Sequence, residues 1–225
     1  MKLLQSDTDY VVAKLPADIR EMMHAQPLFL GGGFIREAIS RGRINDIDLF
    51  GRSKDFLSTC AYRLKDSRGG GRLHETENAI TLFNGTRMPV QFITRWTYQE
   101  PQKVAESFDF TVCQAVIWYG NGGWDSYTHQ NFYPDLAAKR LVYTFPIRHE
   151  EPGGSMLRVR KFLQRGYNIQ VNSLAGVVAR LARAVDFEKA RDEEAVHQVV
   201  SGLLRDVDPL VTIDDDSGGR SVAVD

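Results

Sequence analysis

Residues 28–50, LFLGGGFIREAISRGRINDIDLF, decide the fold of this chain. Apolar residues lead into three glycines at 31–33, a short helical pattern follows, and Asp46 and Asp48 then alternate with apolar residues. Side chains of a strand alternate between its two faces, so both aspartates are predicted to project from the same side. Two carboxylates that close repel each other unless a cation lies between them. The stretch therefore predicts a strand, a glycine turn, a helix and a second strand that carries a cation site.

The glycines ahead of the aspartates point to phosphate as the partner of that cation. Glycine lets the backbone approach a phosphate group, and the amides of a helix N-terminus are suited to bind it. Mg²⁺ is typically held by one or two carboxylates together with phosphate oxygens of a substrate. The order and spacing of the two features predict a site for a nucleoside triphosphate with Mg²⁺ at Asp46 and Asp48. Taken singly, the glycines fit an ordinary strand-to-helix turn and the aspartates fit an exposed strand face.

The composition narrows the class of protein. A chain of 225 residues that is 43% hydrophobic can form one domain, or a domain with a helical appendage. The formal net charge of −1 argues against a strongly basic protein that coats nucleic acid, and a local basic groove stays open. No run of 18 apolar residues is present, and the acidic N-terminus does not resemble a signal peptide, so neither a membrane span nor export is expected. Cys60 and Cys113 lack metal-ligand spacing and predict a reduced, cytoplasmic protein.

The pattern of apolar residues changes near residue 150. Residues 1–150 alternate strands and helices, with strands expected at 28–31, 46–50, 79–83, 89–94, 110–118 and 124–128, an extended segment at 141–144, and helices expected at 17–25, 34–41, 54–65 and 102–106. Residues 151–208 carry helical periodicity at 156–167, 173–185 and 187–204, with no strand among them. Two segments are expected to lack fixed structure: the basic, glycine-rich loop 67–72, for which contact with nucleic-acid phosphate is the alternative, and the acidic tail 209–225.

Four segments in order between residues 28 and 168 resemble the DNA polymerase β-type nucleotidyltransferase superfamily. More closely, they resemble the head and neck of bacterial-type CCA-adding enzymes and poly(A) polymerases. Residues 32–37, GGFIRE, match the family's Gly-Gly-x-x-Arg-Asp with Glu for Asp, and residues 46–48, DID, match its Asp-x-Asp. Residues 107–113, SFDFTVC, partly match Arg-Arg-Asp-Phe-Thr-Ile-Asn, and residues 157–162, LRVRKF, approach its neck helix. The resemblance implies an α+β fold: an α/β, polymerase β-like head with a mixed sheet, followed by a short all-helical neck.

The resemblance also implies an activity, the two-metal transfer of a nucleoside monophosphate from an NTP to a hydroxyl group with release of pyrophosphate. Gly32, Gly33 and Arg36 would bind the triphosphate, while Asp46 and Asp48 would be catalytic and would bind Mg²⁺. A solvated helix arginine is the alternative for Arg36.

Two further site residues follow from the same resemblance. Asp109 matches the family's motif aspartate and would be a third catalytic residue, with a cap of the preceding turn as the alternative. Arg158 matches a neck arginine that contacts the nucleotide, with a solvated helix face as the alternative.

The sequence departs from the family pattern at several positions. Ser107 and Phe108 replace the two arginines before Asp109. The base-reading element Glu-Asp-x-x-Arg falls on residues 151–155, EPGGS, so only its glutamate is kept and CCA synthesis is doubtful. Gln91 stands where many superfamily members place a third carboxylate, so either Asp109 supplies the third acid or the site works with two.

The expected partners are an NTP, with ATP or CTP favoured, and the 3′ hydroxyl of an RNA such as tRNA. The chain ends after one or two helices beyond the neck, so the acceptor stays open between RNA and a protein or small molecule. A nucleotide- or RNA-binding relic of the fold without catalysis is the non-enzymatic alternative. The sequence does not predict the oligomeric state.

Overall fold

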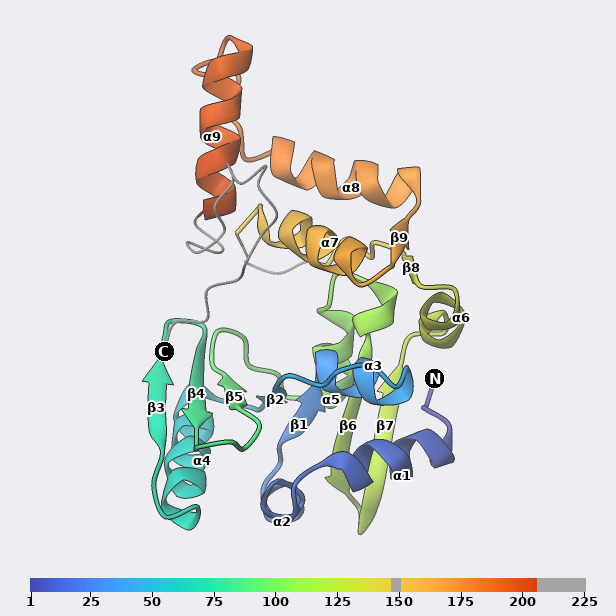
Figure 1. Cartoon of the computed structure of the whole chain (residues 1–225), viewed down its shortest axis with the longest axis vertical. Coiled ribbons are helices and arrows are strands. Elements are labelled where there is room, and N and C mark those ends of the chain that lie inside the picture. Colours follow the sequence, from blue (N-terminus) through green and yellow to red (C-terminus); the bar gives the residue numbers. More distant parts are fainter. Residues whose placement is uncertain (147–150, 206–225) are drawn as a thin grey trace. The chain divides into compact units, whose positions relative to one another are not determined.

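The computed structural model describes residues 1–146 and 151–205, and the chain divides into two compact units, Met1–Ile147 and Arg148–Asp225 (Figure 1). The expected acidic tail, residues 209–225, lies outside the described residues. Within the described ranges, no helix has the length and apolar character needed to cross a membrane.

A seven-stranded mixed sheet forms the centre of the first unit, in the strand order β3-β4-β5-β2-β1-β6-β7. Its strands are β1 (Phe29–Gly31), β2 (Ile47–Phe50), β3 (Arg72–Glu75), β4 (Ala79–Phe83), β5 (Val90–Ile93), β6 (Ala115–Gly120) and β7 (Gly123–Thr128). β2 and β5 run parallel, whereas the other neighbouring pairs of this sheet are antiparallel. The β2–β5 pairing makes the sheet mixed, and the predicted α+β fold with a mixed sheet is confirmed.

Helices cover this sheet (Figure 1). The first unit contains α1 (Gln5–Lys14), α2 (Ala17–Ala25), α3 (Gly33–Ile39), α4 (Lys54–Ser67), α5 (Pro101–Glu106), the 3₁₀ turn η1 (Thr111–Cys113), α6 (Phe132–Ala137) and the short strand β8 (Arg140–Leu141). α3 packs against β1 and β2, α4 against β3, β4 and β5, and α5 against β1, β6 and β7. Asp48 therefore lies on a central strand of the sheet, and Asp46 directly precedes that strand.

The alternation of β2 separates core residues from site residues. Ile47 and Leu49 are fully buried on one face. Asp48 and Phe50 belong to the other face, where Phe50 joins a buried cluster with Val104 of α5. α5 thus covers the Phe50 end of this face, and Asp48 lies half-buried beyond it.

The strand expected at 110–118 is wrong in its first half. Residues 111–113 form the η1 turn, and β6 begins at Ala115. The buried Thr111 hydroxyl donates to Asp135 at 2.6 Å, and the Gln114 side chain donates to the Phe108 carbonyl at 2.8 Å. These side-chain hydrogen bonds fix a turn where the β-branched and aromatic residues alone favour a strand.

The second unit is built mainly from helices. It contains α7 (Gly154–Gln164), the two-residue strand β9 (Asn168–Ile169), α8 (Val171–Ala182) and α9 (Glu193–Arg205), and α7 packs against both α8 and α9. The three predicted helices are present, but α9 begins at Glu193 rather than at the expected residue 187, and β9 departs from the expectation of a unit without strands. A Cβ on Gly153 would lie 2.6 Å from the Leu203 carbonyl oxygen, so this glycine lets the α9 backbone approach closely.

Candidate nucleotide and metal site

The two candidate metal ligands lie at the start of β2. Asp46 directly precedes the strand and Asp48 is its second residue, and both side chains are half-buried. Asp48 pairs in register with Gly31 on β1 and with Gln91 on β5. The glycine turn and the aspartates, which are separated by a helix in the sequence, are therefore brought together by antiparallel pairing of β1 and β2.

Gly32 lies directly against the carboxylate of Asp48. Its backbone has φ 71° and ψ −145°, a conformation that is open to glycine and strained for other residues. A Cβ at this position would lie 2.6 Å from the Asp48 Oδ2 atom. Both the turn and the space for the carboxylate thus require glycine at position 32. The sequence had indicated only a role for this glycine at the start of the helix.

The electrostatic state of Asp48 reflects its surroundings. Burial raises its pKa from the ordinary 3.8 to about 7, the negative charge of Asp46 adds to the rise, and the positive charge of Arg36 opposes it. A cation between the two carboxylates would favour the ionised form of both. Mg²⁺ needs only one or two carboxylates when substrate phosphates complete its coordination, so the pair fits this ion.

Gln91 occupies the position that faces the aspartates from β5. Its Nε2 atom donates to Asp46 Oδ2 at 3.4 Å, and it stands next to Asp48 in register. Within residues 1–146 and 151–205, no three side chains of Asp, Glu, His or Cys are grouped in a way that could hold a metal ion. The structure thus presents two carboxylates with a neutral amide beside them, one of the two arrangements that the sequence left open.

Arg36 is buried near the aspartates and donates hydrogen bonds to Glu37 and Cys113. Its Nε and Nη2 atoms donate to Glu37 Oε1 at 3.0 and 2.8 Å, and its Nη1 atom donates to Cys113 Sγ at 3.2 Å. A Cβ on Gly33 would lie 3.3 Å from Arg36 Nη2, so glycine at 33 leaves room for the guanidinium. Arg36 is therefore no solvated helix arginine. The sequence did not reveal Cys113 as its partner, because 77 positions separate them.

The remaining predicted site residues lie in different surroundings. Asp109 is 1% exposed, follows α5, and its backbone carbonyl accepts from the Thr144 N–H at 2.9 Å. Arg158 is a half-buried residue of α7 in the second unit. The structure brings together the two glycines, Arg36 and the two aspartates, whereas the roles of Asp109 and Arg158 stay predictions.

Comparison with protein families gives a match over most of the first unit. The model described as Gabija anti-defense 2 family protein matches residues 6–139, more than half of the chain. A curated relative, Gabija anti-defense 2 of Bacillus phage SPbetaL7, is 24% identical over 170 residues, which cover 73% of this chain and 40% of the relative. The chain thus spans about two fifths of the length of that relative.

Solved structures of CCA-adding enzymes share the fold. The Thermotoga maritima CCA-adding enzyme complexed with tRNA matches with a TM-score of 0.56 and 18% identity, over 91% of this chain and 52% of that one. A CCA-adding enzyme with CTP matches with a TM-score of 0.56 and 18% identity, over 90% and 50% of the two chains. At this identity the likeness shows the fold alone, which this chain shares with the CCA-adding enzymes.

The contact between Gly32 and Asp48 predicts the effect of a methyl group. Gly32→Ala is expected to lower the free energy of unfolding by about 1–3 kcal/mol, because alanine is strained at this φ and its Cβ would overlap the carboxylate. Gly123→Ala is the control, since a Cβ there meets nothing within 4 Å. Urea unfolding of both variants tests the difference, and equal stabilities would contradict the assignment.

The raised pKa of Asp48 predicts a pH dependence of stability. With a folded pKa near 7 and an unfolded value near 3.8, the folded chain binds more protons between these values, so this group lowers stability as pH rises from about 4 to about 7. In EDTA, Asp48→Asn is expected to flatten this decline and to raise the melting temperature at pH 7.5, by about 2–4 °C per kcal/mol of relieved repulsion. Thermal unfolding at pH 5 and 7.5 is the measurement. An unchanged difference between the two pH values would show that Asp48 is ionised throughout.

Proposed function

This chain belongs to the Gabija anti-defense 2 family, and we propose that it is a Mg²⁺-dependent nucleotidyltransferase that moves a nucleoside monophosphate from an NTP to a hydroxyl acceptor. The observation that carries the proposal is the Asp46–Asp48 pair held beside Gly32 at the start of a helix. The pairing of β1 with β2 supports it, because it places a phosphate-compatible glycine turn against two carboxylates.

Asp46 and Asp48 would hold the metal, and Gln91 would keep Asp46 oriented through its amide. When bound, Mg²⁺ would stabilise charge on the transferred phosphoryl group and lower the pKa of the attacking hydroxyl. The neutral Gln91 leaves the site one negative charge short of a three-acid arrangement. The high pKa of Asp48 also means that the metal-free site is partly protonated near neutral pH.

Gly33 and Arg36 would bind the triphosphate. The guanidinium lies beside the Gly33 backbone and is held by Glu37 through two of its nitrogens. An arginine fixed in this way is already oriented, so less side-chain entropy is lost when it binds phosphate. Glu37 therefore acts as a positioning residue for Arg36 in this proposal.

An RNA 3′ end is the favoured acceptor, and ATP or CTP the favoured donor. The fold-sharing enzymes are described with CTP, ATP and tRNA, which supports a nucleotide donor and an RNA partner. Residues 151–155 keep only the glutamate of the base-reading element of the CCA-adding enzymes. Choice between bases is therefore expected to be looser than in a CCA-adding enzyme, since fewer polar groups are left unpaired by a wrong base.

Transfer of the nucleotide to a protein or small molecule is the second candidate. The family's name favours it, because attachment of a nucleotide to a component of a defence system would be a direct means of anti-defense. A catalytically inactive, nucleotide-binding relic is the third reading, and the two intact aspartates argue against it.

Removal of either aspartate charge tests the proposed catalysis. Asp46→Asn and Asp48→Asn are each expected to reduce transfer of label from α-³²P NTPs to an acceptor at least a hundredfold, because each removes a metal-binding charge while keeping the shape of the side chain. Asp55→Asn, at an exposed position on α4, is the control. Each NTP is offered with Mg²⁺ and either total RNA or protein extract, so the labelled material also identifies the acceptor. Transfer at the wild-type rate by either variant would refute the assignment.

NTP binding by Arg36 variants distinguishes a working nucleotidyltransferase from a relic of the fold that does not bind NTP. Arg36→Ala is expected to weaken Mg²⁺-dependent NTP binding by about tenfold or more, and Arg36→Lys to recover only part of it, because lysine lacks the planar fork that binds phosphate. Calorimetry gives the affinities, Arg63→Ala on the exposed face of α4 is the control, and circular dichroism checks folding. If the wild-type chain binds no NTP with any divalent metal, the proposed function is wrong.

A further inference from the structure

Helix α6 carries a fully buried carboxylate, that of Asp135. It is 0% exposed, its Oδ2 atom accepts from the Thr111 hydroxyl at 2.6 Å, and its Oδ1 atom accepts from Arg140 Nε at 2.8 Å. Burying a carboxylate is costly unless opposite charge and hydrogen bonds compensate it, and here both oxygens have a partner. Arg140 supplies the opposite charge, whereas the bond to Thr111 connects the carboxylate to the η1 turn.

Thr111 begins the η1 turn and is fixed by both its side chain and its backbone. It is 1% exposed, its N–H donates to the Val142 carbonyl at 3.1 Å, and its hydroxyl donates to Asp135. A 3₁₀ turn of three residues has few hydrogen bonds of its own, so contacts with its surroundings determine where it lies. Both α6 and β8 pack against η1. Asp135 therefore anchors the first residue of this turn.

Cys113 ends the same turn and contacts Arg36. Its sulfur accepts from Arg36 Nη1 at 3.2 Å, while Glu37 accepts from the Nε and Nη2 atoms. Glu37 belongs to α3, as Arg36 does, and moves with that helix. Cys113 belongs to another segment, so its contact fixes the guanidinium relative to η1. A thiol is a weak acceptor, so the position of the sulfur matters more than the strength of the bond.

We infer that Asp135 is a positioning residue for Arg36 and acts through Thr111 and Cys113. The hydrogen bond to Thr111 places η1, and η1 places the sulfur against the guanidinium. The inference rests on the proposed function, in which Arg36 binds the triphosphate of an NTP beside Gly33. An arginine that is held in one orientation loses less side-chain entropy when it binds phosphate. Loosening η1 is therefore expected to weaken NTP binding.

Calorimetry of Mg²⁺-dependent NTP binding tests the inference. Thr111→Val keeps the size of the side chain and removes the hydroxyl, and it is expected to weaken binding about threefold or more. Thr111→Ser keeps the hydroxyl and is expected to bind within about twofold of the wild-type chain. Thr94→Val is the matched control, because Thr94 is also buried and its hydroxyl has no hydrogen-bond partner among the described residues.

A double-mutant cycle separates positioning from a general loss of structure. The guanidinium is absent from an Arg36→Ala chain, so the addition of Thr111→Val is expected to cause no further loss of NTP affinity. A merely structural role of the Asp135–Thr111 pair would lower the affinity by the same factor in both backgrounds.

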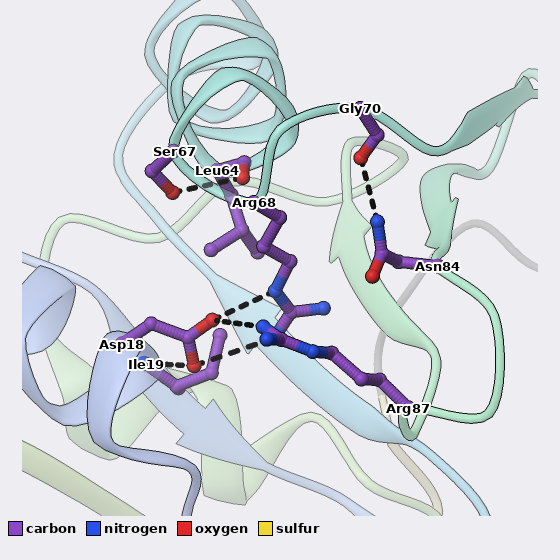
Figure 2. Close-up of polar contacts among 8 residues, drawn as sticks. All are labelled: Asp18, Ile19, Leu64, Ser67, Arg68, Gly70, Asn84 and Arg87. Carbon is purple, nitrogen blue, oxygen red and sulfur yellow. Dashed lines mark hydrogen bonds and ion pairs between the residues drawn. The ribbon is translucent and has the colours of Figure 1, made fainter.

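Arg68 provides an internal control elsewhere in the first unit. Its side chain is 2% exposed and its Nε atom donates to Asp18 at 2.7 Å, whereas Arg87 lies 3.4 Å from the same carboxylate (Figure 2). The sequence predicted a loop without fixed structure at residues 67–72, and the structure instead fixes the Arg68 side chain. Like Arg36, Arg68 is a buried arginine whose Nε–H donates to a carboxylate.

Exchange of the two Nε–H protons with water, followed by ¹⁵N NMR, gives a second readout that needs no nucleotide. Thr111→Val is expected to speed exchange at Arg36 about tenfold and to leave exchange at Arg68 unchanged, because Arg36 contacts η1 and Arg68 is held by Asp18. The loss of each signal in Arg36→Lys and Arg68→Lys assigns it. If the wild-type chain binds no NTP, the proposed function is wrong, and this measurement still decides whether η1 positions Arg36.

Four results would overturn the inference: a wild-type NTP affinity retained by Thr111→Val, an equal loss in the Arg36→Ala background, unchanged exchange at Arg36, or faster exchange at both arginines. If circular dichroism shows that Thr111→Val does not fold, Arg140→Gln replaces it. Arg140 is 40% exposed, and its loss removes the other partner of Asp135, so the same results are expected of this variant.

Discussion

Repulsion between Asp46 and Asp48 is the constraint to which the rest of the site responds. Burying Asp48 beside a second carboxylate costs free energy, and this cost is visible in the pKa of Asp48, which burial raises most and the charge of Asp46 raises further. Each neighbour limits that cost in a different way. Gly32 admits the carboxylate without a clash, Gln91 contributes an amide in place of a third charge, and Arg36 supplies a nearby positive charge. These neighbours let the two carboxylates lie close together without a cation, and a bound cation would lower their repulsion further.

Arg36 connects the pair Asp46 and Asp48 to the rest of the first unit. It is buried, which is costly for a cation unless it is paired, and Glu37 provides the opposite charge at 2.8 Å. The contact with Cys113 joins α3 to the η1 turn, the segment that departs from its predicted strand structure. Glu37 replaces the Asp of the CCA-adding enzyme motif and therefore keeps a carboxylate next to Arg36.

Local patterns in the sequence sufficed for the central elements and for the residues that meet there. Alternation around Asp46 and Asp48 and the glycines before them predicted a phosphate and cation site, whereas the part of Arg36 came from the resemblance to the CCA-adding enzymes. Contacts between distant segments were not predictable from such patterns. Cys113 lies 77 positions from Arg36, and Asp18 lies 50 positions from Arg68 and 69 from Arg87. The three glycines after Arg68 suggested mobility, since local composition does not reveal a partner on another helix. The turn at 111–113 likewise depends on Asp135, which lies 24 positions from Thr111.

The parallel pairing of β2 with β5 bears on how the chain folds as it is synthesised. β2 has its antiparallel neighbour β1 as soon as residue 50 is made, but its parallel neighbour β5 follows only after α4, β3 and β4. Parallel pairing requires such a crossover and closes slowly, because a long loop must be ordered first. Until residues 90–93 leave the ribosome, one edge of β2 has no partner strand, and Asp46 lacks the hydrogen bond from the amide of Gln91. The site is therefore completed late in translation, and a nascent chain that stops before residue 90 carries both carboxylates without the strand that completes their surroundings.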